Sequence, residues 1–217
     1  MLLASVPEQR ASRKPEFPAI ASAVAVAIAG VVVLAVHDLG PQATHMAVHI
    51  GFMNVIAPFV AAVVLRAVDK PTSTVTLWAA AGGQIALLWI WHAPIMQRVA
   101  LEWHALQFVM HGSLLLIATL FWYAVLGLRG RMRWHGAAAL LLNGKLACLL
   151  GALLIFAPRL LLDTSSKYES LSLADQQFAG LLMVTACPLS YVLAGVAFAA
   201  QALFASGKSC PSYPAAT

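Results

Sequence analysis

The sequence is poor in charged residues. Lys, Arg, Asp and Glu together make up 10% of its 217 residues, whereas a typical soluble domain carries about 25%. In contrast, 61% of the residues are hydrophobic, and the mean hydropathy is +0.84. This composition excludes a soluble globular domain and predicts an integral membrane protein.

The sequence also lacks the short motifs of common enzyme classes. It contains no Gly-x-Ser-x-Gly elbow, no phosphate-binding glycine loop and no His-Glu-x-x-His zinc motif. It has only three cysteines, and two of them, Cys148 and Cys187, fall within apolar segments, so no disulfide framework is indicated. The net charge of +5 is scattered over short segments and forms no single basic face. We therefore expect a protein that is not an enzyme and has no nucleic-acid partner.

Long apolar segments dominate what is present. A transmembrane helix needs about 20 mostly apolar residues, and six windows meet this requirement, at about 19–37, 44–66, 74–92, 104–127, 137–158 and 177–202. The first window is too long for the apolar core of a cleavable signal peptide, which spans about 7 to 15 residues. The sequence predicts an all-α, polytopic membrane helix bundle over residues 19–202. A leader (1–18) precedes it and a tail (203–217) follows it.

The basic residues are unevenly divided between the two sides of the predicted bundle. Nine Lys and Arg residues fall on one side and three on the other. The nine are Arg10, Arg13, Lys14, Arg66, Lys70, Arg129, Arg131, Arg133 and Lys208. Because positive charge in short loops marks the cytoplasmic side, we expect both termini to be cytoplasmic.

Six of the seven histidines fall at the opposite, outer side. They are His37, His45, His49, His92, His104 and His111. Successive spans alternate in direction, so the end of one span and the start of the next reach the same membrane face. His45 and His49 lie one helical turn apart, and His104 and His111 lie two turns apart, so each pair shares a helix face.

Such a cluster suits a metal ion or a haem group. Neutral imidazole is the commonest protein ligand for metals, and Met46 lies between two of the histidines. Imidazole with thioether favours copper, especially Cu(I), and zinc would fit the histidines without methionine. Two histidines on facing helices could instead bind a b-type haem. A single histidine near a membrane interface is usually an anchor or a cap, but ionisable residues inside a membrane are costly, and their convergence favours a ligand role.

An ordered set of motifs resembles a known family. These are HMAVH at 45–49 with Pro58 further along the span, WIWHAPI at 89–95, HALQFVMH at 104–111, FWYAVLG at 121–127 and DQQFAGLLM at 175–183. Together they resemble the multi-span CtaG family of bacterial cytochrome c oxidase assembly factors. The resemblance runs from about residue 40 to about residue 200.

The resemblance implies a function and a location. It implies a bacterial inner-membrane protein, in contact with lipid and with cytochrome c oxidase subunits, that helps to insert copper into the oxidase from the periplasmic side. It implies as site residues His45, His49, His92, His104, His111 and Asp175. A haem b electron-transfer protein and an accessory subunit stably bound to the oxidase remain the alternatives.

Four further residues or pairs carry specific expectations. Asp175 could cap its own helix or accept a hydrogen bond from a ligating histidine. Cys187, at a departure from the family pattern, could be a small buried hydrophobe or an added ligand. Pro58 should remove the hydrogen bond to the carbonyl of Asn54 and kink its helix. Gly82 and Gly83 should allow a close helix contact.

Overall fold

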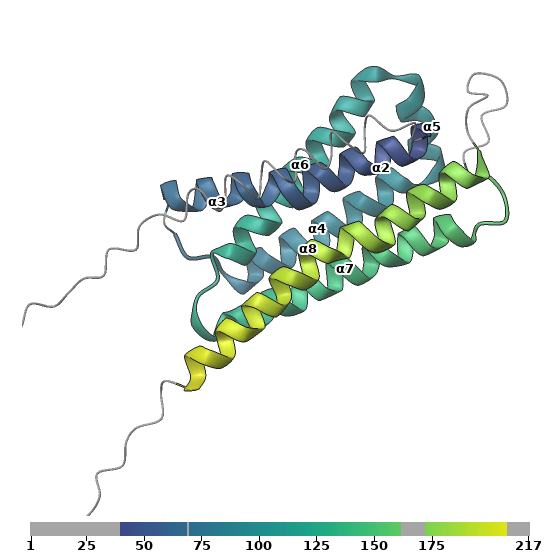
Figure 1. Ribbon diagram of the computed structural model, residues 1–217. Helices are drawn as coiled ribbons and strands as arrows, with labels where there is room; N and C mark the ends of the chain where they lie inside the picture. Colours follow the sequence, from purple (N-terminus) through teal and green to yellow (C-terminus); the bar gives the residue numbers. More distant parts are fainter. Residues whose placement is uncertain (1–39, 69, 162–171, 208–217) are drawn as a thin grey trace, which may run out of the picture.

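In a computed structural model, the described residues are 40–68, 70–161 and 172–207, and every element in these ranges is helical (Figure 1). The elements in chain order are α2 (Pro41–Gly51), the π-helical turn η1 (Phe52–Ile56), α3 (Ala57–Val68), α4 (Thr74–His92), α5 (Pro94–Glu102), α6 (His104–Leu126), the 3-10 turn η2 (Gly130–Met132), α7 (Arg133–Phe156) and α8 (Leu173–Gly207). The all-α prediction is confirmed.

Five stretches of the described residues are long and apolar enough to cross a membrane. They are Pro41–Val68, Thr74–His92, His104–Leu126, Gly130–Phe156 and Leu173–Ala200. The first predicted span, at 19–37, lies outside the described residues. Three spans start earlier than the hydropathy pattern indicated, because polar residues such as Gln42, Arg133 and Asp175 lie in the first turns of α2, α7 and α8. In addition, α8 extends to Gly207, past residue 202, where we placed the end of the bundle.

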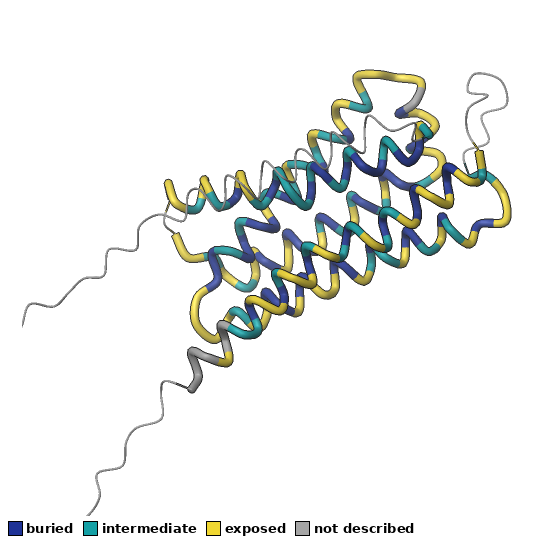
Figure 2. The backbone as a smooth tube through the Cα atoms, viewed as in Figure 1, coloured by how far each residue is buried: buried dark blue, intermediate teal, exposed yellow. Residues whose placement is uncertain are grey.

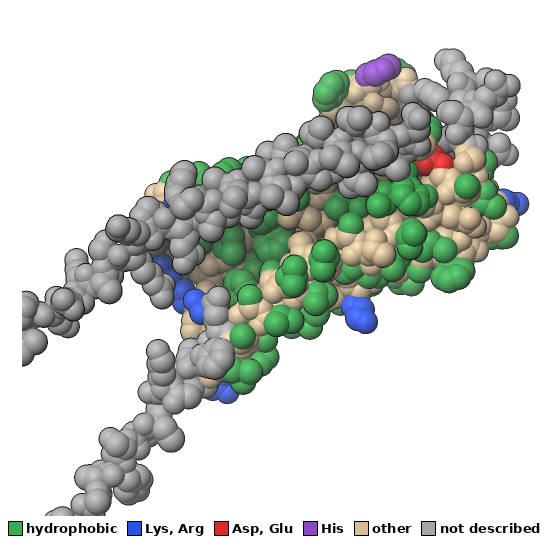
Figure 3. Space-filling model, viewed as in Figure 1, with side chains coloured by type: hydrophobic (Ala, Val, Ile, Leu, Met, Phe, Trp, Pro, Cys, Tyr) green, Lys and Arg blue, Asp and Glu red, His purple; other side chains and the backbone are tan. Residues whose placement is uncertain are grey.

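The outer surface of the bundle is apolar. In each spanning segment only 22% to 44% of the residues in its most apolar window are buried inside the protein, and large side chains such as Phe108 and Phe156 are about four-fifths exposed, at 79% and 82%. The outward faces of the helices are exposed along their length (Figure 2), and much of the described surface in view is hydrophobic (Figure 3). An apolar exterior of this kind is consistent with a polytopic membrane helix bundle.

Helices α7 and α8 run side by side along the bundle (Figure 1), and their backbones come close together at two glycines. A Cβ atom added to Gly180 would lie 2.6 Å from the carbonyl oxygen of Gly151, so only glycine permits this approach. The close contact that we expected at Gly82 and Gly83 forms at Gly83 alone, where a Cβ would lie 3.0 Å from Cδ1 of Ile117 in α6. Gly82 is exposed, and a Cβ there would meet nothing within 4 Å.

The two ends of the bundle differ in their polar residues. At one end, Thr72, just before α4, binds the C-terminal end of α6. Its backbone N–H donates to the carbonyl oxygen of Gly127 (3.2 Å), and its hydroxyl donates to the carbonyl oxygen of Ala124 (2.7 Å). This end, here called the basic end, carries Arg66, Lys70, Arg129, Arg131 and Arg133. The opposite end, where α2, α6 and α8 begin and α4 ends, is called the histidine end. It carries His45, His49, His92, His104 and His111.

The π-helical turn η1 interrupts the first described span. There the N–H of Ala57 bonds to the carbonyl of Phe52, five residues back. Pro58 has no N–H, so the next bond of this series, to Met53, is missing. The indole of Trp122 donates to that carbonyl at 3.0 Å. We had expected proline to free the carbonyl of Asn54; the π turn shifts the register by one residue, and Met53 is the residue whose carbonyl Trp122 satisfies.

Candidate metal centre

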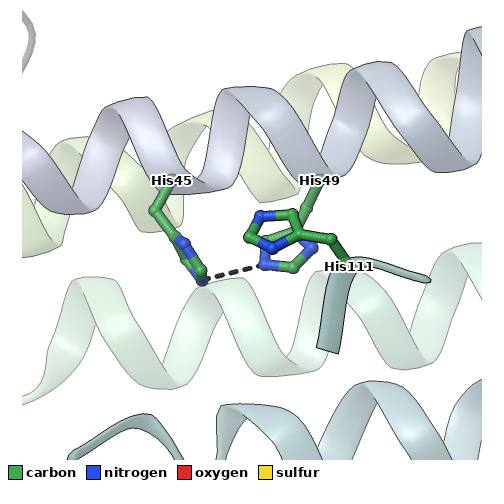
Figure 4. A group of neighbouring side chains, drawn as sticks. All are labelled: His45, His49 and His111. Carbon is green, nitrogen blue, oxygen red and sulfur yellow. Dashed lines mark hydrogen bonds between the residues drawn. The ribbon is translucent and has the colours of Figure 1, made fainter. Parts of the chain in front are cut away.

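Three histidines from two helices meet near the histidine end. His45 and His49 project from α2, and His111 projects toward them from α6 (Figure 4). One ligand nitrogen from each ring lies within 4.8 Å of the others. The Nε2 atoms of His45 and His49 are 2.8 Å apart, so one of them donates a hydrogen bond to the other. The spacing of four residues had placed these two rings on one helix face, as predicted.

The rings are packed tightly against each other. His49 and His111 stack with their planes at 4° and their centroids 4.7 Å apart, and His45 meets His111 edge to face at 5.5 Å. His49 is buried, with 3% of its surface exposed, whereas His45 and His111 are partly buried. We refer to these three residues as the histidine triad.

The helix backbone sets the protonation of one triad ring. Nδ1 of His111 lies 2.7 Å from the carbonyl oxygen of Gln107. A carbonyl only accepts, so Nδ1 carries the hydrogen, and in the neutral ring Nε2 keeps its lone pair. Fixing a ligand's tautomer through its second nitrogen is the usual arrangement in metal sites. In addition, Nδ1 of His49 is buried without a hydrogen-bond partner.

The triad nitrogens lie near the spacing of ligands around one small metal ion. Zinc binds histidine nitrogen at about 2.1 Å, so two ligands of one tetrahedral ion lie about 3.4 Å apart. The triad nitrogens lie within 4.8 Å of one another, so the farthest pair would close by up to roughly 1.4 Å on binding. The donor set is entirely imidazole, which suits copper and zinc.

A second pair of potential ligands lies beside the triad. Nε2 of His92, in the last turn of α4, lies 3.4 Å from the sulfur of Met46. Nδ1 of His92 donates to the carbonyl of Leu88 at 2.7 Å. The ring centroids of His92 and His49 are 5.6 Å apart. Met46 and His92 were both expected at the site, and the structure places them next to the triad.

Comparison with known proteins places this chain in a family. The family described as cytochrome c oxidase caa3 assembly factor (Caa3_CtaG) matches residues 17–204. The chain belongs to this family. The match covers most of the sequence and confirms the resemblance drawn from its motifs. No curated protein and no solved structure matches the chain. The description of the Caa3_CtaG family points to a non-catalytic role and implies an interaction with cytochrome c oxidase.

One histidine expected at the site of this Caa3_CtaG protein lies apart from the triad. His104 is the first residue of α6 and is exposed. It lies seven residues, or about 10 Å along the helix, before His111. His45 and His49 span only about 6 Å of α2, and both helices begin at the histidine end. His104 therefore projects beyond the triad, and its shared face with His111 does not bring it in.

Asp175 contacts helix α2 and none of the imidazoles. Its two carboxylate oxygens accept the backbone N–H groups of Gln42 (2.9 Å) and Ala43 (3.0 Å), and Asp175 is buried. A side chain at position 40 would collide with this carboxylate, so Gly40 allows its approach. Asp175 thus caps the first turn of a different helix from its own and holds the helix that carries His45 and His49. Of the two roles considered for Asp175, the hydrogen bond to a histidine is not formed, and the helix that its carboxylate caps is α2 and not its own α8.

Cys187 lies with other polar groups deeper in the bundle. The side-chain amide of Asn54 donates to its sulfur at 3.6 Å, and the hydroxyl of Ser190 donates to the amide oxygen of Asn54 at 2.8 Å. Cys187 is not part of the histidine triad.

Sequence reasoning missed Gln42, whose buried side-chain amide has no hydrogen-bond partner. Its position four residues before Met46, on the same helix face, was the available signal.

Proposed function

We propose that this Caa3_CtaG protein holds copper at His45, His49 and His111 and delivers it to a cytochrome c oxidase subunit during assembly. The observation that carries the proposal is the convergence of three imidazole nitrogens within 4.8 Å at one end of a membrane bundle. Copper here is cargo, and the chain's own part is to bind it, shield it and release it.

The chemistry of the triad suits a carrier. Imidazole binds copper through a neutral nitrogen, without the added attraction of a thiolate charge. An ion held by imidazoles is easier to release than one held by cysteine thiolates, and Cys187 lies against Asn54 and outside the triad. Partial exposure of His45 and His111 leaves the ion accessible to a partner, while buried His49 anchors it.

The charge distribution supports an orientation in a bacterial inner membrane. Arg66, Lys70, Arg129, Arg131 and Arg133 gather at the end opposite to the histidines. Positive charge in short connections favours the cytoplasmic side. We therefore assign the histidine end to the periplasmic side, where it would meet its oxidase subunit.

The ring geometry favours a metal ion over haem. Two axial histidines must approach haem iron from opposite faces of the porphyrin. His49 and His111 instead stack face to face at 4.7 Å, and His45 and His49 are hydrogen-bonded to each other. No porphyrin fits between rings in these contacts.

The first test is metal analysis of the detergent-purified protein together with its visible absorbance spectrum. We expect about one copper per chain after loading with Cu(I) and no Soret band. His111→Ala should lose most of this copper. His104→Ala is the matched control, because it removes an exposed imidazole from the same helix outside the triad, and it should retain the copper.

Other outcomes would reassign the site. Equal copper in the wild type and in both variants would overturn the triad as the binding site. A Soret band would assign the histidines to haem. Neither copper nor haem would favour an accessory subunit, which should then co-purify with mature oxidase in fixed stoichiometry. Tighter binding of zinc than of copper in a direct competition would assign zinc to the triad.

A further inference from the structure

The contact between His92 and Met46 joins two buried atoms that both carry lone pairs. Nε2 of His92 lies 3.4 Å from the sulfur of Met46. The exposed fractions of the two side chains are 8% and 1%. Both belong to spanning helices, His92 to α4 and Met46 to α2. The contact therefore lies where water does not compete for either atom.

The hydrogen positions follow from the other nitrogen of His92. Nδ1 lies 2.7 Å from the carbonyl oxygen of Leu88, which can only accept, so Nδ1 carries the hydrogen. A neutral imidazole has one hydrogen, and a second would place a costly charge in a buried site. Nε2 thus has a lone pair and no hydrogen. The thioether of Met46 has no hydrogen either, so nothing donates between the two atoms.

A soft cation is the species that such a pair attracts. Thioether sulfur favours Cu(I), whereas zinc prefers nitrogen, oxygen and thiolate ligands. We propose that Met46 and His92 form a second, Cu(I)-selective position next to the histidine triad, to which copper held by the triad passes. This proposal rests on the proposed function, because the triad supplies the ion.

His49 connects the two positions. Its ring lies 5.6 Å from that of His92, centroid to centroid, and 4.7 Å from that of His111. Its Nε2 contacts His45, while its Nδ1 is buried without a partner. In the transfer, bonds from Cu(I) to triad nitrogens break and bonds to the Met46 sulfur and the His92 nitrogen form. The ion remains Cu(I), and no electron is transferred. Two cations this close would repel each other, so one ion occupies the two positions in turn.

The test is X-ray absorption of the purified protein loaded with one equivalent of Cu(I) under reducing, oxygen-free conditions. We expect a sulfur scatterer beside nitrogen scatterers in the wild type. Met46→Leu, a change that nearly conserves volume, should remove the sulfur signal and weaken Cu(I) binding by at least about tenfold. Its affinity for Zn²⁺, measured separately, should stay unchanged, because the triad is intact.

Met53→Leu is the matched control. Met53 is another methionine of the same span and is equally buried, at 3% exposure, so its replacement tests the general loss of a buried sulfur. It should keep both the sulfur signal and the Cu(I) affinity. The wild-type spectrum by itself already tests the proposal if Met46→Leu does not fold.

The possible results separate this proposal from the proposed function. Cu(I) bound only through nitrogen, and lost in His111→Ala, would overturn the second position and leave the triad as the copper site. A sulfur signal that persists in Met46→Leu would also overturn it. Absence of Cu(I) binding in the wild type would overturn both proposals.

Discussion

Gln42 in α2 and Gln176 in α8 are both buried glutamines at the histidine end, with 5% and 0% of their surfaces exposed. Gln176 uses its whole amide group: its oxygen accepts the N–H of Leu161, and its nitrogen donates to the carbonyls of Leu154 and Arg159. The amide of Gln42 has no hydrogen-bond partner. The same residue type is thus fully bonded in one helix and unbonded in another.

This difference extends to the regions around the two glutamines. Helices α7 and α8 pack through Gly151 and Gly180, and the buried amide of Asn143 in α7 donates to a carbonyl of its own helix. Among the described residues, three of the five buried side-chain atoms without a partner belong to α2. An unpaired buried polar group costs about 1 to 3 kcal/mol. We infer that α7 and α8 form the scaffold, and that the unfavourable polar groups are concentrated where the ligand atoms must remain available.

The largest expected effect comes from breaking the scaffold. In Gly180→Ala, the new Cβ would lie 2.6 Å from a backbone carbonyl oxygen of α7, so the two helices must separate. We expect a loss of about 3 kcal/mol in stability, measured as a lower midpoint of thermal unfolding in detergent. Gly82→Ala is the control, because its Cβ would meet nothing within 4 Å and alanine favours the helix by up to about 1 kcal/mol. Equal destabilisation by both substitutions would contradict the scaffold assignment.

A smaller effect is expected where the scaffold holds the site. Asp175→Ala leaves the N–H groups of Gln42 and Ala43 without their acceptor, which should cost about 2 kcal/mol. Because these groups begin the helix that carries His45 and His49, copper binding should weaken as well. Asp175→Asn, which keeps one acceptor oxygen, should lie between the wild type and Asp175→Ala. The measurements are thermal unfolding and a Cu(I) titration, and unchanged copper affinity in Asp175→Ala would show that α2 does not depend on this cap.

The smallest expected effect is a change in stability that is positive for a substitution in α2 and negative for the same substitution in α8. Gln42→Leu removes two unpartnered polar atoms and should raise stability by about 1 kcal/mol. Gln176→Leu leaves an N–H group and two carbonyls without their partner and should lower it by about the same amount or more. Thermal unfolding of the two variants side by side tests this. A loss of stability in both would mean that the two glutamines are equivalent and would remove the basis of the comparison.

Local sequence signals predicted the helices and much of the site. The apolar window at about 74–92 matches α4, Thr74–His92. In the structure, Ser73 caps this helix by accepting the N–H of Thr76, and Pro94 begins the next helix. Helical periodicity also predicted that His45 and His49 share a face. The approach of His111 followed from the alternating direction of the spans. These features depend on neighbours in sequence or on topology alone.

Contacts between helices were harder to predict. The two turns between His104 and His111 satisfied the periodicity rule, but whether a ring reaches a site depends on where the facing helix begins. Asp175 reaches the backbone of α2, more than 130 residues away in sequence, and backbone groups leave no side-chain pattern to detect. Of the predicted glycine pair, Gly83 faces Ile117 of α6 closely, whereas Gly82 meets nothing. The closer contact, between Gly151 and Gly180, was not predicted.

The π turn at Phe52–Ile56 makes the number of residues between α2 and α3 important for the site. A π turn accommodates one more residue than an α-helix would, and each residue turns the helix by about 100°. Deleting one residue there would restore a regular helix and would improve its own hydrogen bonding. It would also rotate His45, Met46 and His49 by about 100° relative to α3, away from the partners that they now face. In this span a single-residue deletion would therefore act at a distance, leaving every ligand in the chain and moving three of them out of the site.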